Sequence, residues 1–201
     1  MAFWFQQFLG VLIRMWIWLN GIEIRARNEQ YIKMLGRSVL MVSNHQRLPD
    51  SFYLAYVVNF LNQDLMPVHH IGARVFRTVG LRFLRRIGAV ALFYWLSGTI
   101  SVYRGAGFEN NIRGPIECLK SGGTVLVYPE GMTNRTDMPL LPLRTGAAAM
   151  AYCSGASVLP TYIHYGDHKV IVEFGKPFTL AENDFTKGTE VIREKLLELM
   201  K

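Results

Sequence analysis

The stretch Val39-Leu-Met-Val-Ser-Asn-His-Gln-Arg-Leu-Pro-Asp50 passes from an apolar run into a polar loop that contains one histidine and one aspartate. The run at residues 39–43 predicts a short strand that is covered on both faces. Residues 44–49 predict a loop, and residues 50–61 predict a helix that has Asp50 near its N-terminus. A strand, a loop and a helix in this order indicate an α/β fold.

The rest of the chain continues the alternation of strands and helices. Further strands are predicted at residues 66–71, 100–103, 124–128, 158–163 and 170–174, and further helices at residues 72–86, 108–120, 143–154 and 189–200. This order predicts a mostly parallel sheet covered by helices. The chain has 201 residues and no internal linker, so we expect one structural domain. Within it, residues 1–36 are interpreted as an N-terminal membrane-associated segment and residues 37–201 as the α/β domain.

The N-terminal residues 3–19 would be apolar nearly all round a helix. A narrow polar stripe interrupts this surface, formed by Gln6, Gln7, Gly10 and Arg14. The segment has no basic start and no small-residue cleavage site, so a cleavable signal peptide is not expected. Its tryptophans, Trp4, Trp16 and Trp18, favour a membrane interface. We therefore expect a helix that lies in one leaflet. The alternatives are a spanning helix with Arg14 at depth and a helix packed on the protein's own core.

The composition is both apolar and basic, with 50% hydrophobic residues and a net charge of +7. This combination suits an anionic bilayer surface, and no zinc-ligand spacing or RNP-type strand indicates a nucleic-acid partner. The helix predicted at residues 72–86 adds a basic face made of Arg74, Arg77, Arg82, Arg85 and Arg86. The apolar run at residues 87–96 is either core or a second membrane contact. Two cysteines are too few for a disulfide framework and indicate reduced thiols in a cytosolic chain.

His45 and Asp50 are the first candidates for chemistry, because functional groups gather at the carboxyl ends of strands in open α/β sheets. A short turn can return the Asp50 carboxylate to Nδ1 of His45, which leaves the other ring nitrogen free to take a proton from a nucleophile. Such a pair corresponds to the histidine base and the orienting aspartate of a Ser-His-Asp triad, but the chain supplies no serine nucleophile to it. The nucleophile would then be a hydroxyl group of the substrate. By itself the spacing also fits a loop histidine beside a helix-capping aspartate.

A second polar loop follows the strand predicted at residues 124–128 and contains a glycine, an acid and a base. Its sequence is Val127-Tyr-Pro-Glu-Gly-Met-Thr-Asn-Arg135. Backbone amides at such a turn, together with a guanidinium group, can hold a phosphate or an oxyanion. Arg104 and Arg144 would add positive charge to the same edge of the sheet.

Together the two loops resemble the glycerolipid acyltransferase superfamily, which includes the 1-acylglycerol-3-phosphate acyltransferases. The resemblance covers residues 39–177 in ordered blocks. These are Asn44 with His45 and Asp50, then Ile100 to Arg104, Tyr128 to Asn134, Leu143 with Arg144 and Gly146, and Val158 to Pro160. In this reading residues 37–201 are an acyltransferase domain that sits, peripheral or monotopic, on the cytosolic face of a membrane.

The resemblance implies the roles of the site residues. His45 would be the general base that activates the acceptor hydroxyl, and Asp50 would orient it. Arg104, Glu130 and Gly131 would shape the site for the acceptor phosphate. The donor would be acyl-CoA or acyl carrier protein, the acceptor 1-acylglycerol 3-phosphate, and neither a cofactor nor a metal is expected.

One departure from the family concerns the acceptor. The family has Glu-Gly-Thr-Arg where this chain has Glu130-Gly-Met-Thr133, so the arginine is absent at its place. Either Arg135 reaches the same phosphate, or the acceptor is another lysolipid.

Three other classes of protein fit the sequence less well than an acyltransferase. A lipid hydrolase needs an enzyme nucleophile, and the chain contains no Gly-x-Ser-x-Gly motif. A metal enzyme would have to use the adjacent pair His69 and His70 or the pair His164 and His168, neither of which predicts a good ligand set. A non-catalytic membrane-binding protein would explain the N-terminus and the basic helix, but not the placement of His45 and Asp50.

Overall fold

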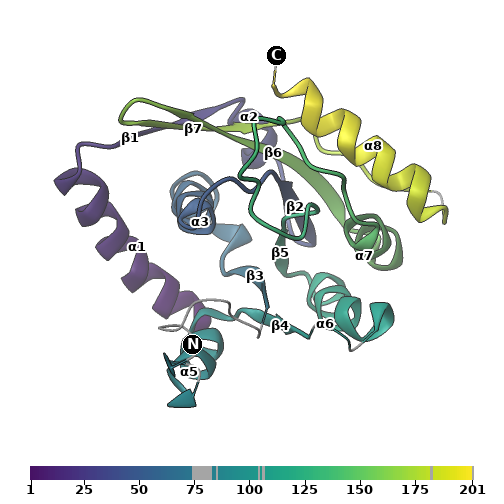
Figure 1. Ribbon diagram of the computed structural model, residues 1–201, viewed down its shortest axis with the longest axis horizontal. Coiled ribbons are helices and arrows are strands. Elements are labelled where there is room, and N and C mark those ends of the chain that lie inside the picture. Colours follow the sequence, from purple (N-terminus) through teal and green to yellow (C-terminus); the bar gives the residue numbers. More distant parts are fainter. Residues whose placement is uncertain (74–82, 85, 104, 106, 182, 201) are drawn as a thin grey trace.

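The computed structural model describes residues 1–73, 83–84, 86–103, 105, 107–181 and 183–200. A seven-stranded sheet lies at its centre, in the order β1-β7-β6-β2-β5-β3-β4 (Figure 1). The strands are β1 Glu23–Arg27, β2 Val39–Ser43, β3 Val68–Ala73, β4 Ile100–Val102, β5 Thr124–Val127, β6 Ser157–Gly166 and β7 Lys169–Phe174. All neighbouring strands are parallel except β6 and β7, which are antiparallel. The predicted α/β fold with a mostly parallel sheet is confirmed.

Helices cover both faces of the sheet. On one side lie α1 (Ala2–Leu19) and α3 (Asp50–Leu61), and on the other α6 (Phe108–Lys120), α7 (Gly146–Ser154) and α8 (Phe185–Glu198) (Figure 1). The short helices are α2 (Gln30–Lys33), the 3-10 turn η1 (Gln63–Leu65) and α5 (Ala89–Ser97).

Strand β2 shows why the apolar run at residues 39–43 forms a doubly covered strand. Its side chains alternate between the two cores: Val39 and Met41 pack with α3, whereas Leu40 and Val42 pack with the other helical layer. Every residue of β2 is buried. Because successive side chains of a strand point to opposite faces, an unbroken apolar run fits a strand with a core on each side.

The sequence did not predict β1, nor the direction of β7. Strand β1 (Glu-Ile-Arg-Ala-Arg) lies at the edge of the sheet with its charged side chains exposed, so it lacks the apolar run that marks the inner strands. It pairs with β7, and this sheet strand therefore lies within the segment 1–36. Strands β6 and β7 form a hairpin that turns at Asp167 and His168.

The predicted start of the helix at residues 72–86 is wrong, because Gly72 and Ala73 are the last residues of β3 and pair with β4. Most of its basic face, including Arg74, Arg77, Arg82 and Arg85, lies outside the described residues. The last helix begins earlier than predicted, at Phe185, because the Asp184 carboxylate caps it by accepting hydrogen bonds from the amides of Thr186 and Lys187.

Helix α1 turns Gln6 and Gln7 of its polar stripe toward the protein, whereas Arg14 of the stripe is exposed. The Gln6 amide is buried, where it donates to the carbonyl oxygens of Val68 and Ser97 and accepts from the amide of Val68. Gln7 pairs with Asn59 of α3. The opposite side of α1 exposes large apolar side chains: Trp4, Phe8, Val11, Leu12, Met15, Trp16, Trp18 and Leu19. Gln6 and Gln7 therefore face the domain, while a set of large apolar side chains faces outward.

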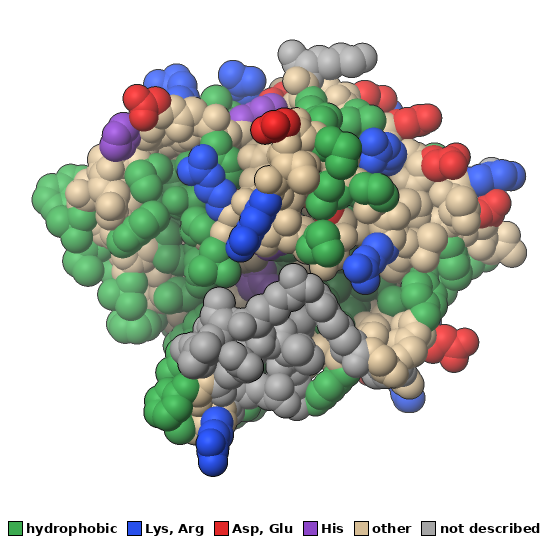
Figure 2. Space-filling view, in the orientation of Figure 1, with side chains coloured by type: hydrophobic (Ala, Val, Ile, Leu, Met, Phe, Trp, Pro, Cys, Tyr) green, Lys and Arg blue, Asp and Glu red, His purple; other side chains and the backbone are tan. Residues whose placement is uncertain are grey.

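The apolar surface continues beyond α1. Most of the run at residues 87–96 lies in helix α5 (Ala89–Ser97), which packs beside α1 and exposes Leu92, Phe93 and Trp95. On α3, Phe60 is 81% exposed. Figure 2 shows hydrophobic side chains gathered over the side where Figure 1 places α1, while charged side chains lie mostly over the opposite side. An exposed apolar surface of this extent indicates contact with a membrane or a partner.

Candidate active site

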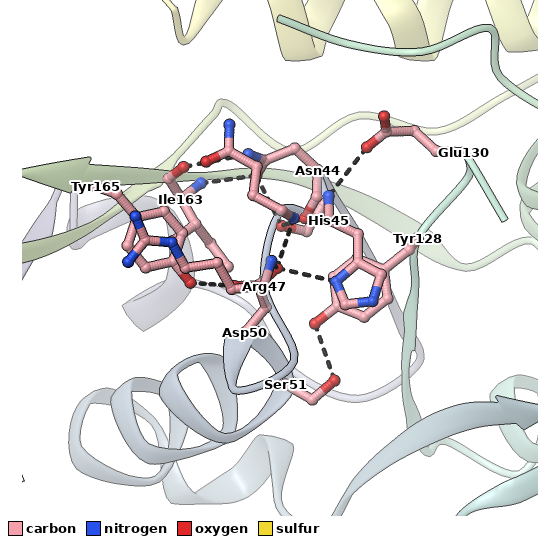
Figure 3. Close-up of polar contacts among 11 residues, drawn as sticks. Asn44, His45, Arg47, Asp50, Ser51, Tyr128, Glu130, Ile163 and Tyr165 are labelled. Carbon is pink, nitrogen blue, oxygen red and sulfur yellow. Dashed lines mark hydrogen bonds and ion pairs between the residues drawn. The ribbon is translucent and has the colours of Figure 1, made fainter. Parts of the chain in front are cut away.

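The loop between β2 and α3 brings His45 and Asp50 together. Oδ2 of Asp50 lies 2.9 Å from Nδ1 of His45 (Figure 3). The same oxygen accepts hydrogen bonds from the backbone amides of Gln46 and Arg47, at 2.8 and 2.9 Å. Asp50 is completely buried in the first turn of α3, and its carboxylate folds the loop back over the helix start. Nδ1 of His45 is thus held by a carboxylate, and Nε2 is the nitrogen left for chemistry.

The second oxygen of Asp50 is held by Tyr165, near the end of β6. The Tyr165 hydroxyl donates a hydrogen bond to Oδ1 of Asp50, and the guanidinium of Arg47 lies 4.1 Å from the centre of the Tyr165 ring. Burial, followed by the hydrogen bond to Asp50, raises the pKa of Tyr165 above its usual range. Tyr165 therefore stays protonated and remains a donor.

The backbone of His45 is held by the second polar loop. Its amide donates to Oε1 of Glu130 at 3.0 Å, and its carbonyl oxygen accepts from the amide of Asn134 at 2.6 Å. Oε2 of Glu130 accepts from the amide of Leu141, so both oxygens of this buried carboxylate bind backbone amides. Glu130, predicted to bind substrate, contacts the backbone of the loop that carries His45.

Asn44 fixes the start of the same loop. Its side-chain amide donates to the carbonyl oxygen of Ile163 at 3.1 Å, and its side-chain oxygen accepts from the amide of Ile163 at 2.8 Å. This pairing extends the ladder between β2 and β6 by one step with a side chain. The residue before His45 is therefore fixed to the sheet, and the ring of His45 projects from a rigid base.

Tyr128 forms one wall of the site. Its ring stacks on the ring of His45, with centroids 4.2 Å apart. Its hydroxyl pairs with Oγ of Ser51 at 3.0 Å, and burial raises its pKa above the usual range (Figure 3). The stack leaves the His45 ring little freedom to turn away from Asp50.

Two cavities meet at His45 and Tyr128, which line both. The smaller has a volume of about 290 Å³ and runs between α1, α3 and α5, where most of its lining is apolar. The larger has a volume of about 950 Å³, a greater share of its lining surface is polar, and Asn111, Thr133 and Arg144 are among its lining residues. The pair is therefore accessible from an apolar side and from a polar side.

The predicted phosphate-binding residues are only partly brought together. Gly131 has a φ of +69°, and a methyl group there would lie 2.6 Å from Nε of Arg144. Gly131 and Arg144 both line the larger cavity. Arg135 is exposed and is not among the described residues that line either cavity. Arg104 lies outside the described residues, although its neighbours Tyr103 and Gly105 line the larger cavity.

Sequence reasoning missed Tyr165, the Asn134 amide and the role of Arg47. The only signal for Tyr165 was its place near a strand end, and the strand was expected to stop at Ile163, whereas β6 continues to Gly166. The histidines weighed as metal ligands are dispersed: His164 bonds to Glu173 at 3.1 Å, and His69 bonds to the carbonyl oxygen of Gly98. In the part of the chain that the structure describes, no group of three His, Cys, Asp or Glu residues could hold a metal ion.

The match to a family model, together with the α/β fold, defines the protein as an acyltransferase. The chain belongs to the Acyltransferase family, whose model matches residues 23–164.

Proteins of known name that resemble this chain are glycerolipid enzymes. It is 24% identical over 189 residues to the 1-acyl-sn-glycerol-3-phosphate acyltransferases of Salmonella typhimurium and Salmonella typhi, and the match covers 88% of this chain and 69% of theirs. The fold is similar to the crystal structure of the 1-acyl-sn-glycerophosphate acyltransferase PlsC from Thermotoga maritima. That match has a TM-score of 0.64 and 22% identity, and covers 97% of this chain and 78% of the other.

Proposed function

We propose that this enzyme transfers a fatty acyl group from acyl-CoA or acyl carrier protein to the free hydroxyl of 1-acylglycerol 3-phosphate. The observation that carries the proposal is the hydrogen bond of 2.9 Å between Nδ1 of His45 and the buried Asp50, at the junction of an apolar and a polar cavity. The names of the Salmonella relatives supply the acceptor.

In the proposed mechanism His45 is the general base. Asp50 holds the proton on Nδ1, so Nε2 can remove the proton of the acceptor hydroxyl. The oxygen then attacks the thioester carbonyl carbon, and the resulting tetrahedral intermediate expels the thiolate. The thiolate takes the proton from the imidazolium, which returns His45 to its starting state. Asp50 stabilises the imidazolium during this cycle, and no acyl-enzyme forms.

The two cavities divide the substrates by polarity. An acyl chain fits the apolar cavity, because burying its methylene groups there is favourable by about 0.8 kcal/mol each. The phosphate of the acceptor fits the larger cavity, where Arg144 supplies a guanidinium group beside the backbone of Gly131. In this arrangement Arg144 substitutes in space for the arginine that the sequence lacks at Thr133.

Thr133 also favours a second candidate acceptor. It lines the larger cavity and stands in the sequence where the family has an arginine. An uncharged side chain there suits a lysolipid that does not present a phosphomonoester. The reaction would be unchanged, and only the acceptor would differ.

The proposed location is the surface of a membrane, with the protein peripheral or monotopic on the cytosolic face. Among the described residues, α1 is the one helix long and apolar enough to cross a bilayer. Its packing against α3 and α5 supports a helix that lies along the surface, because Gln6 and Gln7 of its polar stripe bond to the domain. The apolar cavity is lined partly by Leu9 and Ile13 of α1, so lipid chains would enter beside the membrane.

The test is consumption of the thioester by the purified protein in mixed micelles, with His45→Ala as a parallel control. Acceptors would be lysophosphatidic acid, zwitterionic and neutral lysolipids and glycerol 3-phosphate, each with both donors. Turnover of lysophosphatidic acid that falls by orders of magnitude in His45→Ala is the expected result. Turnover of another lysolipid alone would retain the mechanism and change the acceptor. No turnover by folded protein with any acceptor would contradict the proposal and favour a membrane-binding protein.

A further inference from the structure

Within the apolar cavity, His70 has a polar atom without a partner. Its Nδ1 is buried and makes no hydrogen bond. His70 belongs to β3, lines the apolar cavity, and pairs in register with Leu126 of β5. Alternate residues of a strand share a face, so His70 lies on the same face of the sheet as Val68, which packs in the core with α3.

Buried polar side chains of this cavity differ from His70, because the structure gives them partners. Gln6 bonds to Val68 and Ser97, Asn59 bonds to Gln7, and Ser51 bonds to Tyr128. The hydroxyls of Ser97 and Thr99 pair with each other. Among the described residues, Nδ1 of His70 is the one buried side-chain nitrogen or oxygen without a hydrogen bond, and it lies in a mostly apolar lining.

The ring of His70 is neutral. Burial, followed by the charge of His69, lowers its pKa to about 4. A neutral imidazole has one donor and one acceptor nitrogen, and the tautomer decides which of the two Nδ1 is. A hydroxyl group can both donate and accept, so it matches Nδ1 in either tautomer. A carbonyl oxygen matches only one tautomer, and a saturated hydrocarbon chain matches neither.

We propose that the apolar cavity selects a fatty acyl chain that carries a hydroxyl group, and that this hydroxyl forms a hydrogen bond with Nδ1 of His70. The inference rests on the proposed function and narrows its substrate class. A plain chain in this cavity would leave the nitrogen buried and unpaired, which costs free energy, whereas the hydroxylated chain satisfies it. Because His45 lines the same cavity, the selection takes place next to the reacting atoms.

The hydroxylated chain can belong to either substrate, and the experiment separates the two sources. In the first arm the thioester carries one hydroxyl, moved along the chain from one isomer to the next, and the lysolipid acceptor is plain. In the second arm the lysolipid chain carries the hydroxyl and the thioester is plain. Each arm is compared with fully plain substrates of equal chain length, and kcat/KM is measured for the intact protein in mixed micelles.

The expected result is a preference of about tenfold in kcat/KM for one hydroxylated isomer, in one of the two arms. In His70→Leu, and in His70→Met as a second variant with a flexible side chain, this ratio falls to about one. The matched control is His69→Leu, because His69 is the adjacent histidine, has the carbonyl oxygen of Gly98 as its partner and does not line the cavity. His69→Leu should retain the wild-type preference in kcat/KM for the hydroxylated isomer.

Equal kcat/KM for plain and hydroxylated substrates in the wild type would overturn the inference and leave the proposed function standing. A preference that survives in both His70 variants would also overturn it. Absence of transfer with every substrate would overturn the proposed function, and the inference with it.

Discussion

The hydroxyl of Tyr165 donates a hydrogen bond to Oδ1 of Asp50, the carboxylate oxygen that His45 does not use. With three donors on Oδ2 and one on Oδ1, the carboxylate cannot rotate without losing partners. Arg47, which gives its backbone amide to Asp50, also covers the Tyr165 ring. The orientation of His45 therefore depends on a strand, β6, that is remote from it in sequence.

Removal of the Tyr165 hydroxyl should lower turnover without affecting substrate binding. In Tyr165→Phe the ring stays beneath Arg47, but Oδ1 of Asp50 loses its donor. Since hydrogen bonds to charged groups contribute about 1.5–3 kcal/mol, we expect kcat to fall about tenfold or more with KM unchanged. The control is Tyr162→Phe, which removes a hydroxyl bonded to the carbonyl oxygen of Pro139. Equal kcat losses in the two variants would contradict the role given to Tyr165.

Substitution of Glu130 by glutamine tests whether this residue positions the His45 loop or binds substrate, the role that the family resemblance implies. Glu130→Gln places an amide NH₂ against one of the two backbone amides that the carboxylate accepts, from His45 or from Leu141. We expect the free energy of unfolding to fall by about 1–3 kcal/mol and kcat to fall, with the acceptor KM little changed.

The measurement for Glu130 is steady-state kinetics over a range of acceptor concentrations, together with urea unfolding. Glu117→Gln is the control, since Glu117 forms an exposed ion pair with Arg113 that contributes little. A rise in acceptor KM at constant kcat would show that Glu130 binds substrate.

Gly131→Ala tests the contact between the second loop and Arg144. The new methyl group would lie 2.6 Å from Nε of Arg144, at a backbone φ of +69°. The guanidinium must move, so we expect a higher KM for a phosphate-bearing acceptor, in addition to a backbone cost of about 1–2 kcal/mol. Gly21→Ala is a matched control, because Gly21 has a φ of +60° and nothing within 4 Å of the added methyl group. It should lose similar stability and retain the KM; an unchanged KM in Gly131→Ala would argue against Arg144 as a phosphate ligand.

Local patterns were enough to predict most of the fold. The doubly buried strands β2 and β5 and the helix α6 lie where apolar runs and helical spacing placed them, because burial on both faces leaves a strong local pattern. Strand β1 was missed because an edge strand has exposed charges and its pairing with β7 depends on residues 146 positions away, as between Glu23 and Lys169.

Some features of the candidate site could likewise be predicted from local sequence, and others could not. His45, Asp50 and the loop that contains Glu130 could be predicted, because they lie in the segments that follow strands β2 and β5 of a parallel sheet. The contacts of Glu130 with backbone amides could not, since they depend on the path of two loops in space. The hydrogen bond from Tyr165 joins positions 115 residues apart, and only the packing of β6 beside β2 brings it about.

The stability of the protein should depend on pH through His70. Burial lowers its folded-state pKa to about 4 from the ordinary value of 6.5, so the unfolded chain takes up a proton at a higher pH than the folded chain. The contribution of neutral His70 is therefore fully present above pH 6.5 and is lost as the pH falls toward 4. Over this window of about 2.5 pH units the loss is at most about 3–4 kcal/mol. We expect urea unfolding to show this loss in the wild type but not in His70→Leu, with His69→Leu as control. Parallel pH curves for wild type and His70→Leu would contradict it.

The exposed side of α1 should bind the membrane surface. Trp4 and Trp18 are 74% and 78% exposed and lie near opposite ends of the helix, so a helix that lies along the bilayer surface inserts both at once. Burial of one large aromatic side chain contributes about 1.5–3 kcal/mol, and each change to alanine should therefore weaken binding to anionic vesicles about tenfold or more.

Sedimentation with vesicles gives the affinities, and Val191→Ala on α8, in the helical layer across the sheet, is the control. If α1 instead spanned the membrane, the two tryptophans would lie at opposite interfaces, and removal of either one would leave a helix that still crosses the bilayer. Similar losses for Trp4→Ala and Trp18→Ala, reversible on dilution, therefore support a helix in one leaflet. Binding that neither change weakens would show that the apolar side of α1 does not contact lipid, and the outward-facing tryptophans would then have to cover a protein partner.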